Sequence, residues 1–336
     1  MKKILLISTG GTIASLPSEG GLEPSLGSGA ILKYLTDLSD GFSFEHLELF
    51  SLDSSNIQPE QWQTMASAIY ENIDSVDGII ITHGTDTMAY TAAALSFMLV
   101  GLSKPVVLTG SQVPISNPNS DARVNLCTAI AAIDAGMTGV LLAFNHRIIN
   151  GTRAVKISTI GFDAFRSINK DDMAKIYADG IRIFTKHTGS IEHKRELKSE
   201  LSSDVFLLKL IPGTKPEIFD ALSRLNYRGI VIEAFGAGGM HYIKRNLYEK
   251  LEELCASGIT VAVCSQCLYE RSDLGIYEVG QRIIKTGAIS AEDMTTEAAV
   301  TKLMWALGQS REPKEVKRLF YKNLAGELEA AEPILN

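Results

Sequence analysis

The 336-residue sequence contains only four cysteines, too few for the disulfide scaffold of a secreted protein. No apolar run reaches the length of a membrane span, and the first run, residues 4–7, is too short for the core of a signal peptide. Basic residues do not predominate, since 32 lysines and arginines stand against 39 acidic residues. We therefore expect a cytoplasmic globular protein that binds neither membrane nor nucleic acid.

Several chemical motifs are also missing. The six histidines show no zinc-ligand spacing, and the single Cys-x-x-Cys pair, Cys264 and Cys267, has no second pair beside it. Redox chemistry and half a zinc site remain alternatives for this pair, but buried thiols at a strand end are favoured, and we expect no metal and no cofactor. A P-loop ending, a G-x-G-x-x-G run and a G-x-S-x-G nucleophile elbow are all absent.

Short apolar runs alternate with helical patterns along the chain. Four runs are too continuously apolar for strands with one exposed face, which indicates buried parallel strands. They are residues 4–7, 79–82, 106–109 and 140–144. Segments with apolar residues at helical spacing lie between these runs. One such segment begins at Pro59, a residue suited to the first position of a helix. The predicted fold class is α/β, with a larger N-terminal domain, 1–185, whose mainly parallel sheet is covered by helices.

The polar segment 186–204 is the predicted linker between domains, because it is rich in Lys, Glu and Ser. Strand and helix patterns alternate again over 205–336, which predicts a smaller C-terminal α/β domain. Near the N-terminus, the Gly/Ser/Pro-rich stretch 15–29 is expected to be an irregular loop beside Thr12, an arrangement typical of a lid.

Threonines follow the first two of these strands in glycine-containing loops. Thr12 comes after Gly10-Gly11, and Thr85 lies in the run His83-Gly84-Thr85-Asp86. Ligands bind at the carboxyl ends of parallel strands, and glycine lets the backbone approach them closely. Thr12 alone fits either a nucleophile or a hydroxyl bonded within its own turn. For His83, a packed side chain is favoured over a general base.

A threonine nucleophile needs an activating group, and lysine near a carboxylate is one choice. Lys156 is available for this role, although a solvated lysine is the commoner situation. With these residues a resemblance becomes specific: five segments, in order and spacing, resemble the bacterial type I L-asparaginases. They are Thr9-Gly10-Gly11-Thr12-Ile13-Ala14, Asp53-Ser54-Ser55, His83-Gly84-Thr85-Asp86-Thr87-Met88-Ala89-Tyr90, Thr109-Gly110-Ser111-Gln112 and Gly151-Thr152-Arg153-Ala154-Val155-Lys156. The resemblance continues through 161–165 and 301–305 and covers essentially the whole chain.

The resemblance implies an amidohydrolase that converts L-asparagine to L-aspartate and ammonia, with room for weak glutaminase activity. A threonine nucleophile would form a β-aspartyl acyl-enzyme, without a cofactor. The implied catalytic residues are Thr12, Thr85, Asp86 and Lys156. The implied substrate-binding residues are Asp53, Ser54, Ser55, Thr85 and Asp86. The order in which the two threonines act is left open at this point.

The family resemblance has one departure and two further implications. Many relatives carry a tyrosine on the loop after Thr12, where this sequence has Leu22. Either Lys156 and Thr85 do more of the work here, or a tyrosine from elsewhere, such as a neighbouring subunit, reaches the site. Self-association as a homodimer or homotetramer is implied. Ser265-Gln266-Cys267 resembles a regulatory segment of some members, so Cys267 is a candidate allosteric residue.

Two rival functions follow from the same residues. The amidase subunit of archaeal-type tRNA-dependent amidotransferases carries an extra N-terminal domain, whereas the first strand here begins at Ile4. A non-catalytic amino-acid sensor is expected to lose at least one of the four catalytic residues, because hydrolysis would destroy its signal. All four are present, which favours an enzyme.

Overall fold

The computed structural model describes residues 1–18, 21–24, 29–38, 41–189, 194–272, 274–275 and 278–329. The chain forms two compact units, Met1–Ser199 and Glu200–Asn336. No helix of the described residues is both long and apolar enough to cross a membrane.

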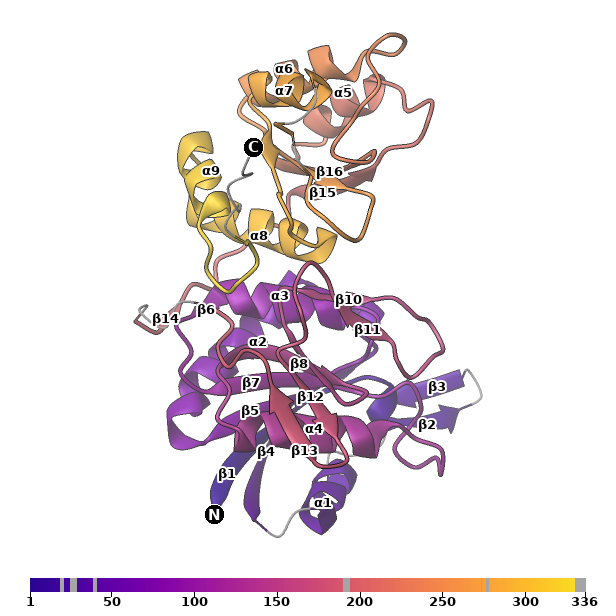
Figure 1. Ribbon diagram of the computed structural model, residues 1–336, viewed down its shortest axis with the longest axis vertical. Coiled ribbons are helices and arrows are strands. Elements are labelled where there is room, and N and C mark those ends of the chain that lie inside the picture. Colours follow the sequence, from indigo (N-terminus) through magenta and orange to yellow (C-terminus); the bar gives the residue numbers. More distant parts are fainter. Residues whose placement is uncertain are drawn as a thin grey trace. The chain divides into compact units, whose positions relative to one another are not determined.

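The first unit is built on an eight-stranded sheet with the order β13-β12-β9-β8-β7-β5-β1-β4 (Figure 1). The parallel strands are β1 (Lys2–Gly10), β4 (Phe42–Leu52), β5 (Gly78–Thr82), β7 (Pro105–Thr109) and β8 (Gly139–Phe144). Antiparallel strands extend the sheet beyond β8; they are β9 (Arg147–Asn150), β12 (Ala174–Tyr177) and β13 (Gly180–Ile183). The prediction of a mainly parallel sheet is confirmed.

Helices cover both faces of this sheet, which explains why its central strands are continuously apolar. On one face, α1 (Gly29–Leu38) and α4 (Ala122–Asp134) share a core with the strand residues Leu6, Ile80 and Val107. The other face carries α3 (Met88–Met98), which packs on β7 and β8, and α2 (Pro59–Asn72), which packs on α3 (Figure 1). Proline at the first position of α2 marks its start, as expected from the sequence.

Two parts of the first unit differ from the expectation. The stretch 15–29 is not wholly irregular, because β2 (Ser15–Ser18) and β3 (Gly21–Pro24) form an antiparallel pair. Each of these strands pairs only with the other, so Pro17 needs no second partner strand. Strand β4 was not predicted, since it lies at the sheet edge and alternates exposed and half-buried residues. The remaining short strands are β6 (Leu99–Val100), β10 (Ala154–Lys156), β11 (Phe165–Ser167) and β14 (Glu196–Leu197).

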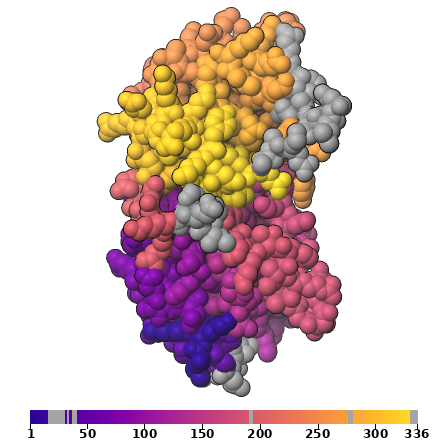
Figure 2. Space-filling view, turned by 60° about the vertical axis from the view of Figure 1, so that its left-hand side comes forward, coloured from indigo at the N-terminus to yellow at the C-terminus, as the bar shows by residue number. Residues whose placement is uncertain are grey.

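The second unit is a smaller α/β structure, as predicted. Its parallel sheet has the order β15 (Val205–Lys209), β16 (Gly229–Ala234), β17 (Thr260–Ser265) and β18 (Ile289–Ser290). Three helices share a core with this sheet; they are α5 (Glu217–Arg224), α6 (Leu247–Ala256) and α7 (Glu278–Lys285). Helix α8 (Thr296–Gln309) packs on β15, β16 and β17. The last helix, α9 (Pro313–Tyr321), packs against α8 and lies among the yellow surface atoms of Figure 2.

A buried ion pair ties α8 to the segment that follows α9. Lys302 and Glu327 are both fully buried, with Nζ 2.5 Å from Oε1. Lys302 also donates to the carbonyl of Lys322 at 2.8 Å, and Glu327 accepts from the backbone N–H groups of Leu324 and Ala325. Burial lowers the pKa of Lys302, and the facing carboxylate opposes this shift. Each charge is therefore tolerated in the interior because the other is present.

Without the Lys302 ammonium, the Glu327 carboxylate would be buried with no opposite charge beside it. We expect Lys302→Met to lower the free energy of unfolding of the second unit by about 3–5 kcal/mol. Urea unfolding followed by the fluorescence of Trp305, which lies buried in the same helix, measures this change. The exposed Lys314 offers a matched control, since Lys314→Met should change stability by no more than about 0.5 kcal/mol. Equal unfolding midpoints for both variants would show that the pair is not stabilising.

Candidate active site

The carboxyl ends of β1, β4 and β5 lie side by side and carry most of the predicted site residues. Thr12 begins a short 3-10 helix directly after β1, and the segment 53–55 follows β4. Thr85 and Asp86 follow β5, and Lys156 ends β10. Because β1 pairs with both β4 and β5, the loops that leave these three strands are neighbours.

Two glycines allow these loops to meet. Gly11 has a φ of 83°, and a Cβ atom at this position would lie 2.3 Å from the backbone nitrogen of Gly84. A Cβ atom on Gly84 would in turn lie 2.6 Å from the hydroxyl oxygen of Ser54. Such distances are far inside van der Waals contact, so only glycine fits at both positions. The residues that follow them, Thr12 and Thr85, therefore belong to loops in direct backbone contact.

The structure brings Thr85, Asp86 and Lys156 together. The Lys156 ammonium donates to the Thr85 hydroxyl at 2.9 Å and to the Asp86 carboxylate at 2.6 Å. The lysine side chain is only 16% exposed, whereas the aspartate side chain is 63% exposed. Lys156 is therefore not a solvated lysine: it is a cation held between a hydroxyl and a carboxylate, the arrangement that a lysine-assisted threonine requires.

The segment after β4 contacts the same loop. The hydroxyl of Ser54, which is 3% exposed, accepts from the N–H of Asp86 at 3.2 Å. The carbonyl of Ser54 accepts from the Thr87 hydroxyl at 2.7 Å. Beside it, Ser55 donates to the Asp53 carboxylate through its hydroxyl and through its N–H. These bonds, the hydroxyl first, lower the pKa of Asp53, so this exposed carboxylate is ionised at neutral pH.

The residues on either side of Thr12 are held by backbone hydrogen bonds. The N–H of Gly11 donates to the carbonyl of Leu52 at 3.0 Å, and that of Ile115 donates to the carbonyl of Ile13 at 3.2 Å. Within the described part of the chain, the half-buried Thr12 side chain makes no hydrogen bond, with a tyrosine or any other residue. Leu22 lies in β3 opposite Pro17, and its side chain is outside the described structure.

His83 is a packed, hydrogen-bonded side chain, as favoured from the sequence. Thr91 accepts from the Trp62 indole N–H at 3.0 Å, so its own proton is directed to Nε2 of His83, also 3.0 Å away. Nδ1 of His83 then carries the ring proton and donates to the carbonyl of Gly84 at 2.7 Å. Complete burial lowers the pKa of His83 to about 4, which keeps the ring neutral.

The depressed pKa makes the stability of the first unit depend on pH. As the pH falls from about 6.5 to about 4, the unfolded chain binds a proton at His83 that the folded chain does not, so stability decreases. The shift corresponds to about 3 kcal/mol at the acid end of this range. We expect His83→Gln to be less stable at pH 7.5 but to lose less stability on acidification. Urea unfolding of both proteins between pH 4 and 8 tests this; parallel stability curves would contradict it.

Of the two cysteines in the Cys-x-x-Cys segment, only one is buried. Cys264 is 2% exposed, and burial raises the pKa of its thiol to about 12. Cys267 is exposed, so the expectation of two buried thiols is wrong for this residue. Both cysteines are free thiols, and the N–H of Cys267 donates to the Ser265 hydroxyl at 2.9 Å. No group of three or more metal-ligating side chains is found among the described residues.

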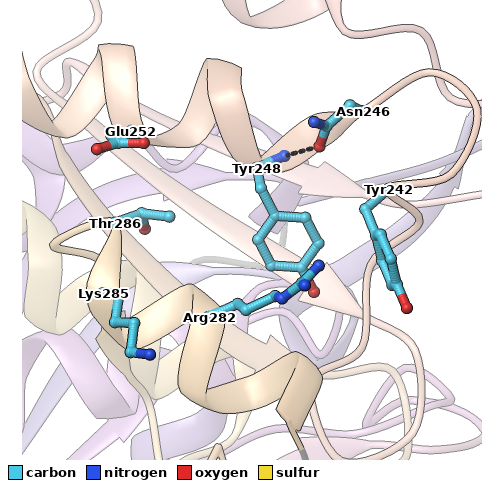
Figure 3. A pocket seen from close by; sticks show the side chains of 7 residues that line it. All are labelled: Tyr242, Asn246, Tyr248, Glu252, Arg282, Lys285 and Thr286. Carbon is cyan, nitrogen blue, oxygen red and sulfur yellow. Dashed lines mark hydrogen bonds between the residues drawn. The ribbon is translucent and has the colours of Figure 1, made fainter.

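A hollow of about 230 Å³ lies between α6 and α7 of the second unit (Figure 3). Three of its polar side chains, those of Asn246, Thr286 and Arg282, make contacts within the fold. Asn246 accepts from the N–H of Tyr248 at the start of α6, and Thr286 donates to the carbonyl of Ile283 at the end of α7. Arg282 stacks on the ring of Tyr242, 4.9 Å from its centre. This hollow has no hydroxyl–lysine pair like that of Thr85 and Lys156, so the sheet edge of the first unit is the candidate active site.

Two family models match this chain, one in each unit. Residues 3–189 match the family model "Asparaginase, N-terminal", and residues 204–320 match "Glutaminase/Asparaginase C-terminal domain". This chain belongs to the asparaginase family. The family resemblance predicted from the five segments is thereby confirmed.

Four comparisons show how far the similarity of this asparaginase-family chain extends. The L-asparaginase of Thermococcus kodakarensis is 44% identical over 97% of this chain and 99% of its own length. The structure of the thermostable L-asparaginase from that organism superposes with a TM-score of 0.92 at 43% identity, covering 98% of this chain and 100% of the other. L-asparaginase I from Vibrio cholerae gives a TM-score of 0.86 at 29% identity, covering 98% and 99%. A subunit of the glutamyl-tRNA(Gln) amidotransferase from Pyrococcus abyssi is 35% identical over 98% of this chain and 77% of its own length.

Proposed function

We propose that this chain is an L-asparaginase, which hydrolyses L-asparagine to L-aspartate and ammonia. The observation that carries the proposal is the bonded trio of Thr85, Lys156 and Asp86, in a loop that touches the loop of Thr12. One threonine is thus linked to a lysine, and the hydroxyl of the other makes no hydrogen bond to the described residues. Family membership and the 44% identical L-asparaginase support the same substrate.

The charges of the site suit an amino-acid zwitterion. Asp53 and Asp86 carry negative charge toward the substrate's α-ammonium group. Lys156 bonds Asp86 through Oδ1, so Oδ2 can accept from that ammonium. Ser55 orients the carboxylate of Asp53, and Ser54 holds the segment against the Asp86 loop. We assign Asp53, Ser54, Ser55, Thr85 and Asp86 to substrate binding, with backbone N–H groups of these loops as donors to the α-carboxylate.

In the proposed reaction, the Thr12 oxygen attacks the side-chain amide carbon of asparagine. The carbon–nitrogen bond breaks, ammonia leaves with the added proton, and a β-aspartyl ester on Thr12 remains. Water then cleaves the ester and regenerates the hydroxyl. Thr85 and Lys156 exchange the protons, and backbone N–H groups near Thr12 and Thr85 stabilise the oxyanion, each donor contributing about 3 kcal/mol.

Several finer features are proposed with this function. No described side chain bonds the Thr12 hydroxyl, which is compatible with a group supplied by a second copy and so with a homodimer or homotetramer. Four free thiols suit the reducing cytoplasm. The exposed Cys267 suits a regulatory asparagine site. We also propose that residues 1–185 and 205–336 form separate domains, joined by a linker at 186–204.

The assignment is tested by ammonia release from L-asparagine and, separately, from L-glutamine, with the purified protein and no added metal. We expect release from asparagine with a marked preference over glutamine. One methylene separates the two substrates, and a pocket discriminates such a difference by about 1–3 kcal/mol. A sigmoidal dependence on asparagine would support a second site, and release from neither substrate would favour the sensor.

The nucleophile is tested by Thr12→Ala, which removes the attacking oxygen while leaving the backbone of the turn unchanged. We expect turnover to fall by at least about 10³-fold with an unchanged thermal unfolding midpoint. Thr12→Ser, which restores a hydroxyl, should recover part of the activity. Retention of more than a few per cent of activity by a pure preparation of the alanine variant would exclude Thr12 as the nucleophile.

A further inference from the structure

Gln112 lies in the loop after β7, and none of the proposed steps uses it. Its side chain nevertheless contacts the catalytic trio directly: Oε1 accepts from the Thr85 hydroxyl at 3.2 Å. On the other side, Nε2 donates to the carbonyl oxygens of Thr159 at 3.3 Å and Gly161 at 3.1 Å. Gln112 therefore bridges Thr85 to the loop that follows Lys156.

The two carbonyls decide which way the amide of Gln112 faces. A carbonyl oxygen only accepts hydrogen bonds, so the NH₂ group must face Thr159 and Gly161. The amide oxygen then faces Thr85, and the hydroxyl proton of Thr85 is directed to Gln112. Lys156 is an ammonium that only donates, so it meets a lone pair of the same hydroxyl. The hydroxyl of Thr85 is thus fixed in direction from two sides.

The backbone of Gln112 is itself firmly held. Its N–H donates to both carboxylate oxygens of Asp121, at 3.0 and 3.1 Å, and the N–H of Val113 donates to the same carboxylate. Asp121 is 8% exposed and also accepts from the amide of Asn125 at 2.9 Å. That amide donates in addition to the carbonyl of Gly110. The first turn of α4 therefore fixes the position from which Gln112 reaches Thr85.

We propose that Gln112 is a positioning residue that sets the direction of the Thr85 hydroxyl for the proton exchange with Lys156. This inference rests on the proposed asparaginase function and deepens it. With its proton on the Gln112 side, Thr85 presents a lone pair to Lys156 and to the reacting groups. Without an acceptor at residue 112, the hydroxyl rotates among several directions, and a smaller fraction of molecules holds the reactive one.

The first test is Gln112→Met, which keeps the length of the side chain but removes both its acceptor and its donor. We expect kcat for L-asparagine to fall about five- to tenfold, as for the loss of one hydrogen bond between neutral groups. KM should stay within about twofold, because the variant leaves Asp53 and the Asp86 carboxylate in place. Thermal unfolding of the same preparation checks that the variant is folded.

A second variant, Gln112→Glu, gives a readout that a purely structural role would not change. One carboxylate oxygen can still accept from Thr85, while the other loses the bonds to Thr159 and Gly161, and the variant adds a negative charge beside the Lys156 ammonium. That charge favours the protonated lysine, so the acidic limb of the pH profile of kcat should move to higher pH. An unchanged pH profile together with unchanged kcat would overturn the inference, even if the methionine variant failed to fold.

A matched control separates positioning from loop tethering. Ser158→Ala removes the bond at 3.0 Å between the Gly161 N–H and the serine hydroxyl, which loosens the loop that Gln112 holds. It leaves the contact of Gln112 with Thr85 intact, so kcat and the pH profile should match the wild type.

Equal losses in Ser158→Ala and Gln112→Met would overturn the inference in favour of a simple tether. An active wild type with unchanged kcat in Gln112→Met would overturn the inference alone. A wild-type chain that released no ammonia would overturn the proposed function and the inference together.

Discussion

The candidate active site depends on a contact between two stretches of backbone, at Gly11 and Gly84. Strands β1 and β5 are paired in register up to Ser8 and Thr82, so their loops leave the sheet at the same level. Because neither glycine has a side chain, the backbones of the two loops can be in contact. The bonds from the Asp86 N–H to Ser54 and from Lys156 to Thr85 lie around this contact.

Polar groups around this contact are bonded in ways that leave specific atoms for a substrate. The buried groups, His83 and Ser54, have their hydrogen bonds satisfied within the fold. Two exposed carboxylates, those of Asp53 and Asp86, lie at this edge of the sheet, and Lys156 pairs with Asp86. The ammonium group of a ligand would therefore meet negative charge at this edge.

The sequence was informative where a physical signal is local. Buried parallel strands such as β5 could be predicted because they need apolar residues on both faces, and the strand-end threonines followed from them. Strand β4 and the β2–β3 pair were not predicted, because edge and hairpin strands carry no continuous apolar run. The link from Gln112 to Thr159 and Gly161 spans nearly fifty residues, and no local pattern encodes it. The exposure of Cys267 likewise depends on the tertiary fold.

The anchoring of the loop after β7 has a practical consequence for protein engineering. Asp121 fixes the start of this loop through Gln112 and Val113, while residues 116–119 are exposed. Their hydrogen bonds run within the turn itself, from Asn117 to the Pro114 carbonyl and from Ser120 to the Asn117 carbonyl. Added residues at this tip leave the anchor untouched. The tip is thus a natural place to insert a linker or an affinity peptide beside the catalytic edge of the sheet.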